Sequence, residues 1–537
     1  MTSNVGARAL DVRQASAVEG YLSKVAAAVS TTDRPIAVHR SENDLHTPVI
    51  VERSNDVSTY LNSSLFALLP PIYPEWLGDR SFNETHGARF AYVVGEMARG
   101  ITSAKMVIEA ARAGFVGFFG SAGLEPPQIR TALEEIKCAL GPEATGWGAN
   151  LIHNPDRPDM ERATVEFFLE HRVKRVSASA FMRLSHDVAH YSIAGLARDS
   201  NGRISRSTHV FAKVSRPEVA RQFMSPAPSD MLRELVAAGR ITSEQSELAQ
   251  SAPVAEDVTV EGDSGGHTDN RPIASLFPVI ANLRDDLAAR HGYVRPIRLG
   301  LAGGLGAPSA IAAAFQQGAA YVMTGSINQS AIEAGVSSAA RALLAQAEIA
   351  DVTMAPAADM FELGVKVQVL KRGTMFATRG QKLYELYRRY DSLEALPDKE
   401  RRWLETQVLR ESVSDAWANC RDYLRRAHPT QMARAEHDAK LRMALVFRRY
   451  LFLGAEWARD GADDRRIDYQ IWCGPAMGAF NDWVRGSALE PIGSRTVAAI
   501  GRNLLEGAAA ITRAHQLRMA GVHVPAEFFS MPPKHMG

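Results

Sequence analysis

The chain has 537 residues, which is enough for a large buried core and for more than one domain. Its 61 basic and 60 acidic residues give a formal net charge of +1, so we expect no general affinity for nucleic acid or another polyanion. Three widely separated cysteines fit neither a disulfide framework nor a zinc cluster. No apolar run approaches the ~20 residues that span a bilayer, and charges near the N-terminus argue against a signal peptide. We therefore expect a cytoplasmic protein without membrane contact.

Residues 1–80 contain short strand-like pieces, such as Thr47 to Glu52, and predict an N-terminal extension. From Gly87 onward, short apolar runs alternate with helical patterns, one of which begins at Ser103 as a plausible N-cap. The predicted strands are Arg89–Val94, Phe115–Phe119, Gly146–Ile152, Val173–Ala178, Thr208–Val214, Asp257–Val260, Ile297–Leu301 and Tyr321–Thr324. Eight such strands favour an α/β fold with a parallel (β/α)8 TIM barrel over residues 81–350, rather than an open sheet.

Glycine turns follow the last two predicted strands. Gly303, Gly304 and Gly306 precede a helix that Pro308 opens, and Gly325 and Ser326 follow the next strand. Such turns offer backbone N–H groups beside a helix N-terminus, and a phosphate often lies at this end of a barrel. The spacing fits neither a Walker A loop nor a dinucleotide-binding fingerprint. The turns therefore predict a phosphate site, although tight structural turns would account for the same glycines.

Other polar residues follow predicted strands, where a barrel collects its catalytic groups. Gly265 and Gly266 come shortly after the sixth strand, and His267 follows them. Lys213 closes the fifth strand. It could act there as a fixed cation, or as a Schiff-base lysine if the protein were a flavin-free aldolase. Asn150 ends the third strand, where its amide could both donate to and accept from a heteroaromatic ring.

Two further patterns are weaker. His186 and His190 share a helix face as zinc ligands would, but no third ligand lies nearby, so we expect no metal site. Cys473 lies in the sequence W-C-G-P, and a buried thiol is a better interpretation of it than a nucleophile.

The composition changes in residues 351–537, which we expect to form a mainly helical region. Leu404, Val408, Val413 and Trp417 have the spacing of one helix face. Arginine pairs recur here among acidic residues, which is typical of a solvated helix surface. Asp468 to Trp483 is dense in aromatic and small residues, and we expect it to pack against the barrel or a ligand.

The motifs A-G-G-L-G, T-G-S-I-N-Q and D-S-G-G-H-T-D-N-R-P resemble the FMN-dependent nitronate monooxygenase and enoyl reductase superfamily. Within it, the chain is similar to the trans-acting enoyl reductases of polyunsaturated-fatty-acid and polyketide synthases. The more specific stretches are A-K-V-S-R-P-E-V-A, A-D-M-F-E-L-G-V-K-V-Q-V, R-G-Q-K-L-Y-E-L-Y and D-Y-Q-I-W-C-G-P-A-M-G-A-F-N. The resemblance extends from about residue 80 to residue 520.

The resemblance implies FMN in the barrel mouth, with Gly303, Gly304, Gly325 and Ser326 at its phosphate. Gly95, Met97, Ala98, Asn150, Lys213, Gly265 and Gly266 would also line the cofactor site. His267 matches the active-site histidine of the superfamily. NADPH would reduce the flavin, which would then reduce an enoyl thioester carried by an acyl carrier protein or carrier domain.

The helical region is the expected lid and carrier contact. Residues 380–470 hold 18 Lys and Arg against 16 Asp and Glu, a balance that by itself defines no docking patch. A nitronate monooxygenase-like oxidase and a flavin-free scaffold of a synthase remain as alternatives. The sequence leaves the oligomeric state open, a homodimer included.

Overall fold

The fold is known from a computed structural model, which describes residues 19–40, 48–51, 65–154 and 158–534. Its centre is a closed parallel barrel with the strand order β10-β11-β13-β14-β4-β5-β6-β7. The strands are β4 (Tyr92–Val94), β5 (Val116–Phe119), β6 (Trp147–Ile152), β7 (Arg175–Ser179), β10 (His209–Val214), β11 (Asp257–Glu261), β13 (Arg298–Ala302) and β14 (Tyr321–Thr324). All eight predicted strands are present, and the predicted (β/α)8 barrel is confirmed.

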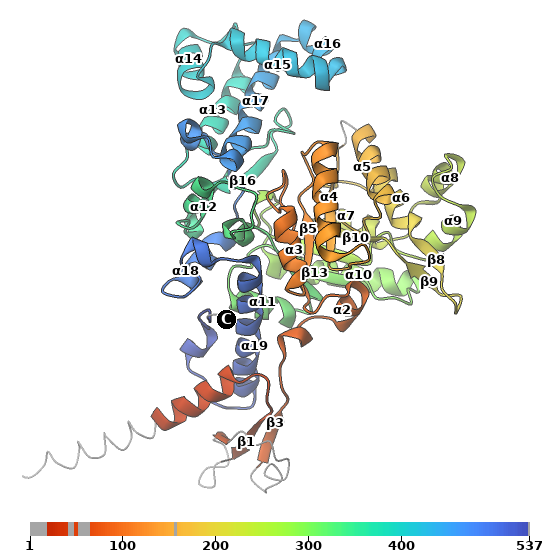
Figure 1. Cartoon of the computed structure of the whole chain (residues 1–537), viewed down its shortest axis with the longest axis vertical. Coiled ribbons are helices and arrows are strands. Elements are labelled where there is room, and N and C mark those ends of the chain that lie inside the picture. The colour runs from red at the N-terminus through yellow and green to blue at the C-terminus, as the bar shows by residue number, and fades with distance from the viewer. Residues whose placement is uncertain (1–18, 41–47, 52–64, 155–157, 535–537) are drawn as a thin grey trace, which may run out of the picture.

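Helices surround this barrel, as the alternating pattern predicts (Figure 1). Ser103 caps the first of them, accepting a hydrogen bond from the Met106 N–H. The outer helices are α3 (Ala104–Arg112), α4 (Pro126–Leu140), α5 (Pro158–Glu170), α6 (His186–Ala194), α7 (Pro217–Met224), α8 (Ser229–Ala237), α9 (Ser243–Ala249), α10 (Ile273–His291) and α11 (Pro308–Gln316). Helix α12 (Ser338–Leu344) lies apart from the barrel, near α18 (Ala476–Val484), whose Asn481 donates to the Leu344 carbonyl (Figure 1). A hairpin of β8 (Leu196–Arg198) and β9 (Ile204–Arg206) precedes β10, and the 3-10 turn η3 (Ser326–Ser330) follows β14.

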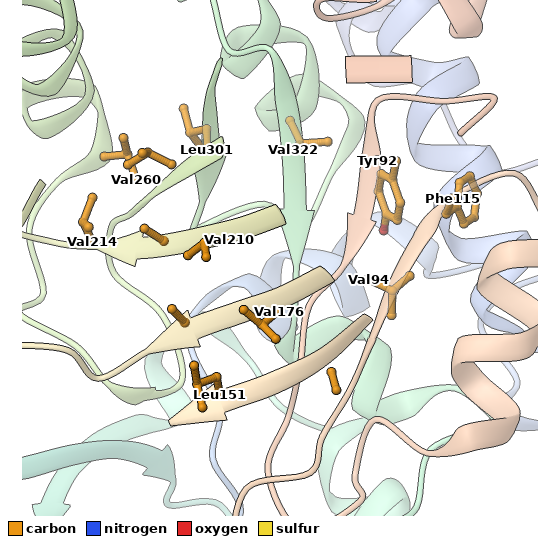
Figure 2. Close-up of a cluster of buried hydrophobic side chains, with 14 of the residues drawn as sticks. Tyr92, Val94, Phe115, Leu151, Val176, Val210, Val214, Val260, Leu301 and Val322 are labelled. Carbon is orange, nitrogen blue, oxygen red and sulfur yellow. The ribbon is translucent and has the colours of Figure 1, made fainter. Parts of the chain in front are cut away.

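Successive strand residues face opposite sides of the barrel wall. Val210 and Val214 belong to the cluster between the strands and the outer helices, which Figure 2 shows together with side chains of neighbouring strands. Phe211, between them in sequence, belongs instead to a cluster with Phe82 and Tyr321 inside the barrel. Because both faces of the strands are covered, the strands read in the sequence as continuous apolar runs.

Helix α2 (Arg80–His86) closes the amino-terminal end of the barrel, where buried charges meet. Arg298 donates two hydrogen bonds to Asp257, at 2.6 and 2.8 Å. His86 Nε2 lies 3.1 Å from the same carboxylate, and His86 Nδ1 accepts from Arg175 at 3.0 Å. His86, Asp257 and the buried His209 lie close enough to share a metal ion. The guanidinium groups of Arg298 and Arg175 already outnumber the single carboxylate, so the site disfavours a further cation.

This network predicts a loss of stability in mild acid. Burial lowers the pKa of both His86 and His209, so each ring takes up its proton less readily in the folded than in the unfolded chain. The stabilisation that the two neutral histidines give the folded chain is complete above the unfolded-state pKa of about 6.5, and it declines as the pH falls below that value. We expect the free energy of unfolding to drop by about 2 kcal/mol or more between pH 7.5 and pH 5. Denaturant titrations at both pH values measure this, and a His209→Leu variant should show a smaller drop. Equal stability at both pH values would contradict the expectation.

Outside the barrel, an antiparallel sheet lies near the start of the chain. It has the order β2-β1-β3, with β1 (Ile36–Arg40), β2 (Pro48–Val51) and β3 (Leu65–Leu69), followed by the short turn η2 (Pro74–Trp76). The predicted strand-like piece at Thr47 to Glu52 corresponds to β2, although its first and last residues lie outside the described ones. Helix α19 (Val497–Met519), from the other end of the sequence, packs against both this sheet and α11 (Figure 1).

The region after the barrel begins with a small antiparallel sheet. Strands β15 (Val352–Pro356) and β16 (Lys366–Leu370) pair with each other, and β16 also pairs with β12 (Gly266–His267), which comes from the loop after β11. The helices that follow form a tier beside the carboxyl end of the barrel (Figure 1). They are α13 (Phe376–Arg389), α14 (Asp398–Trp403), α15 (Val413–Ala427), α16 (Pro429–His437) and α17 (Ala439–Asp460).

The predicted helix face from Leu404 to Trp417 is wrong as one continuous helix. A π-helical turn, η5 (Leu404–Leu409), ends at Arg410, which has a left-handed φ of 58°. Helix α15 then starts anew behind the Ser412 cap. Leu404, Val408 and Val413 are nevertheless buried in one cluster, because the break lets both helices cover the same core.

The remaining elements return the chain to the barrel. They are the turns η4 (Ile349–Asp351), η6 (Asp463–Asp468), η7 (Ile492–Ser494) and η8 (Ala526–Phe529) and the helices α18 (Ala476–Val484) and α19. Domain boundaries at residues 80 and 350 stay a prediction. Among the described residues, no helix combines the length and the apolar character that crossing a membrane requires.

Candidate active site

The glycine turns after β13 and β14 lie side by side at the carboxyl end of the barrel, because those strands are neighbours. Gly304 has a φ of +72°, and a Cβ placed on Gly304 or on Gly325 would meet no atom within 4 Å. A Cβ on Gly303 would instead lie 2.9 Å from the Asp263 carbonyl oxygen. Gly304 and Gly325 therefore border open space, whereas Gly303 allows the turn to approach the loop after β11.

The segment around Cys473 packs against these turns. The Gly474 N–H donates to Ser326 Oγ at 3.0 Å. A Cβ on Gly265 would lie 3.0 Å from the backbone nitrogens of Cys473 and Gly474, so only glycine allows this approach. The expectation that Asp468 to Trp483 packs on the barrel is thus confirmed. The Ser326 hydroxyl accepts this bond and keeps its own hydrogen to donate.

The turn after β4 borders the same opening. The Met97 N–H donates to Thr102 Oγ1 at 2.9 Å, and that hydroxyl donates to the Gly95 carbonyl at 2.9 Å. A Cβ on Gly95 would lie 3.0 Å from the Met323 side chain, so this glycine also serves close packing between strands β4 and β14. Ala98 follows in the same partly buried turn. Hydrogen bonds within the turn therefore fix its shape before any ligand binds.

Asn150 is buried at the end of β6. Its amide nitrogen donates to the Ser177 carbonyl at 3.1 Å and to Ser179 Oγ at 2.8 Å. Both amide hydrogens thus hold the side chain against β7. The side-chain oxygen is the atom that Asn150 has to offer to a ligand, as an acceptor.

Lys213 lies between two carboxylates at the barrel mouth. Its Nζ is 3.2 Å from Glu96 Oε1 and 3.3 Å from Glu261 Oε1. Burial lowers the pKa of Lys213, but Glu261 and Glu96 outweigh burial and raise the pKa above its ordinary value. A lysine held as a cation is a poor Schiff-base nucleophile, which counts against an aldolase. The sequence reasoning missed both glutamates, although each lies at or just after a strand end, as Lys213 does.

His267 lies on β12, which is held in place by β16. The register pairs Gly266 with Gln368 and His267 with Val367. The Nε2 atom of His267 lies 3.3 Å from Asp359 Oδ2, and the two side chains are 34% and 45% exposed. Burial lowers the pKa of His267, but the contact with Asp359 outweighs burial and raises the pKa above its ordinary value. The imidazole is therefore poised to carry a proton near neutral pH.

The residues around the opening fit a phosphate-bearing ligand. Three buried side-chain atoms have no hydrogen-bond partner in the described part of the chain. Ser264 Oγ can donate to a phosphate, whereas Gln329 Oε1 and Gln368 Oε1 can only accept, from donor groups elsewhere on a ligand. Helix α11 begins close behind the Gly303-Gly304 turn with no side-chain cap, so the positive end of its dipole is available. Open glycine turns, unpaired polar atoms and a helix N-terminus together make a site for an anionic, polar cofactor.

The two weaker sequence patterns have partners or surroundings within the fold. His186 Nε2 contacts Glu234 at 2.8 Å, whereas His190 Nδ1 contacts Arg240 at 3.0 Å, so the two rings bind different partners. Cys473 is fully buried, and burial raises the pKa of its thiol to about 12. A thiol in that state is a poor nucleophile.

Known proteins match most of the chain. It is 46% identical over 451 residues to a component of the polyunsaturated fatty acid synthase of Thraustochytrium sp., covering 82% of this chain and 30% of that protein. It is 39% identical over 490 residues to the polyketide biosynthesis protein PksE of Bacillus subtilis, covering 91% of this chain and 63% of that protein. The chain thus spans less than two thirds of the length of either relative. Residues 390–469 match the family described as acyl-carrier-protein S-malonyltransferase, inserted helical domain.

A solved structure is similar over nearly its whole length. The enoyl reductase domain of MlnA, from the macrolactin biosynthesis cluster of Bacillus amyloliquefaciens, superposes with a TM-score of 0.79 and 36% sequence identity. The superposition covers 83% of this chain and 99% of that domain. It includes more than the barrel, since the barrel alone is a much smaller part of the sequence. From this match and the two relatives above, the chain belongs to the enoyl reductase family of polyunsaturated-fatty-acid and polyketide synthases.

Proposed function

We propose that this protein is a trans-acting enoyl-thioester reductase that uses FMN and NADPH. The observation that carries the proposal is the match to an enoyl reductase domain over 99% of that domain, at 36% identity. The open glycine turns after β13 and β14, together with His267, supply a site for enoyl reduction.

In this proposal the glycine turns bind the FMN phosphate. Gly304 and Gly325 offer open space, Ser326 offers a hydroxyl hydrogen, and Gly303 and Gly265 set the approach of neighbouring backbone. The remaining residues proposed to line the cofactor site are Gly95, Met97, Ala98, Asn150, Lys213 and Gly266. The chemistry supplied by bound FMN is hydride transfer, in from NADPH and out to the β-carbon of the enoyl thioester.

The protein side chains set charge and orientation around that chemistry. Lys213 is a fixed cation because Glu96 and Glu261 hold it on two sides. Asn150 presents an acceptor oxygen. His267 donates a proton to the α-carbon of the substrate, since its raised pKa favours the protonated ring. With Nε2 facing Asp359, Nδ1 is the nitrogen left to face the substrate.

The proposed partner is an acyl carrier protein or carrier domain of a synthase. One relative is named as a subunit of a polyunsaturated fatty acid synthase and another as a polyketide biosynthesis protein. The helical region matches an insert of an enzyme named for an acyl-carrier-protein substrate. That region, residues 390–469, includes α15, α16 and α17. Helix α17 contacts the turn after β4, since Arg99 lies 3.3 Å from Glu456, whereas α15 and α16 lie farther from the barrel (Figure 1). The helical region is therefore the proposed contact for the carrier.

Anaerobic stopped-flow absorbance of the purified, FMN-loaded protein tests the function. We expect NADPH to bleach the visible flavin absorbance, and a crotonyl thioester on a carrier protein or thiol mimic to restore it without oxygen. Restoration only after air is admitted would replace the reductase with a nitronate monooxygenase-like oxidase. A protein that binds no FMN would overturn the cofactor and the function together.

A further inference from the structure

The segment between β15 and β16 reaches the rim histidine from outside the barrel. It carries Asp359, whose carboxylate lies 3.3 Å from His267 Nε2. The same sheet fixes the histidine's backbone, because β16 pairs with β12. Two independent contacts, one through the backbone and one through a side chain, thus join His267 to residues 100 and 92 positions later in the sequence, Val367 and Asp359.

The turn that carries Asp359 is anchored without the help of that carboxylate. The Ala357 N–H donates to the Val365 carbonyl at 2.9 Å and closes the turn. Phe361, at its centre, is fully buried and packs against Tyr384 and Tyr387 of α13, with ring centroids 5.5 and 5.3 Å away. The neighbouring Glu362 pairs with Arg448 on α17 at 3.1 Å. The contact with His267 is therefore not needed to shape the turn.

The charges that face His267 come from three elements. Asp359 is the acid within ion-pair distance among the described residues, while Glu261 at the end of β11 and Lys213 on β10 act from farther away with opposite signs. Burial raises the pKa of Asp359, but the contact with His267 outweighs burial and lowers it below its ordinary value. Asp359 therefore remains a carboxylate at neutral pH and favours the protonated imidazole.

We infer that Asp359 is a positioning residue for His267: its carboxylate turns the ring so that Nδ1 faces the barrel mouth, and it retains the proton on the imidazole. The contribution to proton delivery rests on the proposed function, whereas the pairing of the two side chains does not. By this inference, the segment after the barrel completes the active site rather than only covering it.

The test uses the FMN-loaded full chain with an Asp359→Asn substitution, which keeps the shape and removes the charge. The 15 histidines are labelled with carbon-13, and the His267 signal is identified by its loss in His267→Gln. We expect the proton affinity of His267 to fall about three- to tenfold in Asp359→Asn, and Asp359→Glu to recover part of it. The matched control is Glu362→Gln, which removes a carboxylate of the same turn. Because buried Phe361 and the Ala357–Val365 hydrogen bond still anchor that turn, the His267 titration should stay unchanged.

A second readout follows the reaction. In the wild type, flavin reoxidation by the thioester should decline as the pH rises through the His267 pKa, and in Asp359→Asn this decline should begin at lower pH. An unchanged His267 titration in Asp359→Asn would overturn the inference. If the pKa of His267 fell in Asp359→Asn but the pH dependence of flavin reoxidation did not change, the role of Asp359 in proton delivery would be overturned. A chain that reduces no thioester would refute the proposed function instead, and the titration would still decide the pairing.

Discussion

Gly304→Asp is expected to yield a folded protein that has lost its FMN. A side chain at this position would extend into the open space of the glycine turn, where we place the phosphate. Two like charges about 4 Å apart near a protein surface repel by about 4 kcal/mol, so we expect FMN affinity to fall by about 100-fold or more. Flavin absorbance of the purified protein, and equilibrium titration with added FMN, measure the loss.

The matched control is Gly304→Asn, which has the same size and no charge. Gly304 has a φ of +72°, a left-handed conformation that both Asn and Asp adopt more readily than other side chains. Backbone strain is thus similar in the two variants, and the difference between them isolates the carboxylate. We expect Gly304→Asn to retain much of its FMN. Full flavin content in Gly304→Asp would place the phosphate elsewhere.

His267→Ala is expected to retain FMN and its reduction by NADPH but to slow flavin reoxidation by the enoyl thioester. A positioned acid usually contributes about 10²- to 10⁴-fold to a proton-transfer step. The ring also makes the 3.3 Å contact with Asp359, so its removal leaves that carboxylate without its partner. Single-turnover stopped-flow kinetics separate the two half-reactions and report which one slows.

The control is His186→Ala, which removes an imidazole that pairs with Glu234 on the outer helices. This variant should match the wild type in both half-reactions, because the His186 ring pairs with the exposed Glu234 rather than with a residue proposed to line the cofactor site. If His267→Ala reoxidised as fast as His186→Ala, proton delivery would have to come from another group or from water. A slowed reduction by NADPH would instead indicate that the histidine shapes the flavin environment.

The barrel is predictable from the sequence because its strands are covered on both faces. Runs such as Tyr92–Val94 and Tyr321–Thr324 are uniformly buried, and glycines or helix caps follow them closely. The β/α repetition then leaves few alternative folds. The carboxyl ends of all eight barrel strands meet at one end of the barrel. Glycines and polar residues that follow a strand therefore mark the region of the active site, even before the side-chain packing is known.

Groups whose role depends on contacts between distant segments were not predictable in this way. Glu96 and Glu261 were overlooked although they satisfy the criterion that selected Lys213, which is placement at a strand's carboxyl end. Asp359 had no such signal, because it reaches His267 from a turn outside the barrel. The break at Arg410 was hidden because the apolar spacing continues across the π-helical turn, the left-handed Arg410 and the new cap at Ser412.

The packing of α19 has a consequence for how the chain folds during synthesis. This helix covers α11 and contributes Val497 to Ile511 to the core around the barrel. The last barrel strand ends at Thr324, roughly 200 residues before α19 ends at Met519. At a ribosomal rate of about 5–20 residues per second, the apolar surface that α19 covers would stay exposed for roughly 10 to 40 s after the last barrel strand is synthesised. During this interval the emerging chain offers a surface that chaperones recognise, and the barrel becomes fully enclosed only when α19 has left the ribosome.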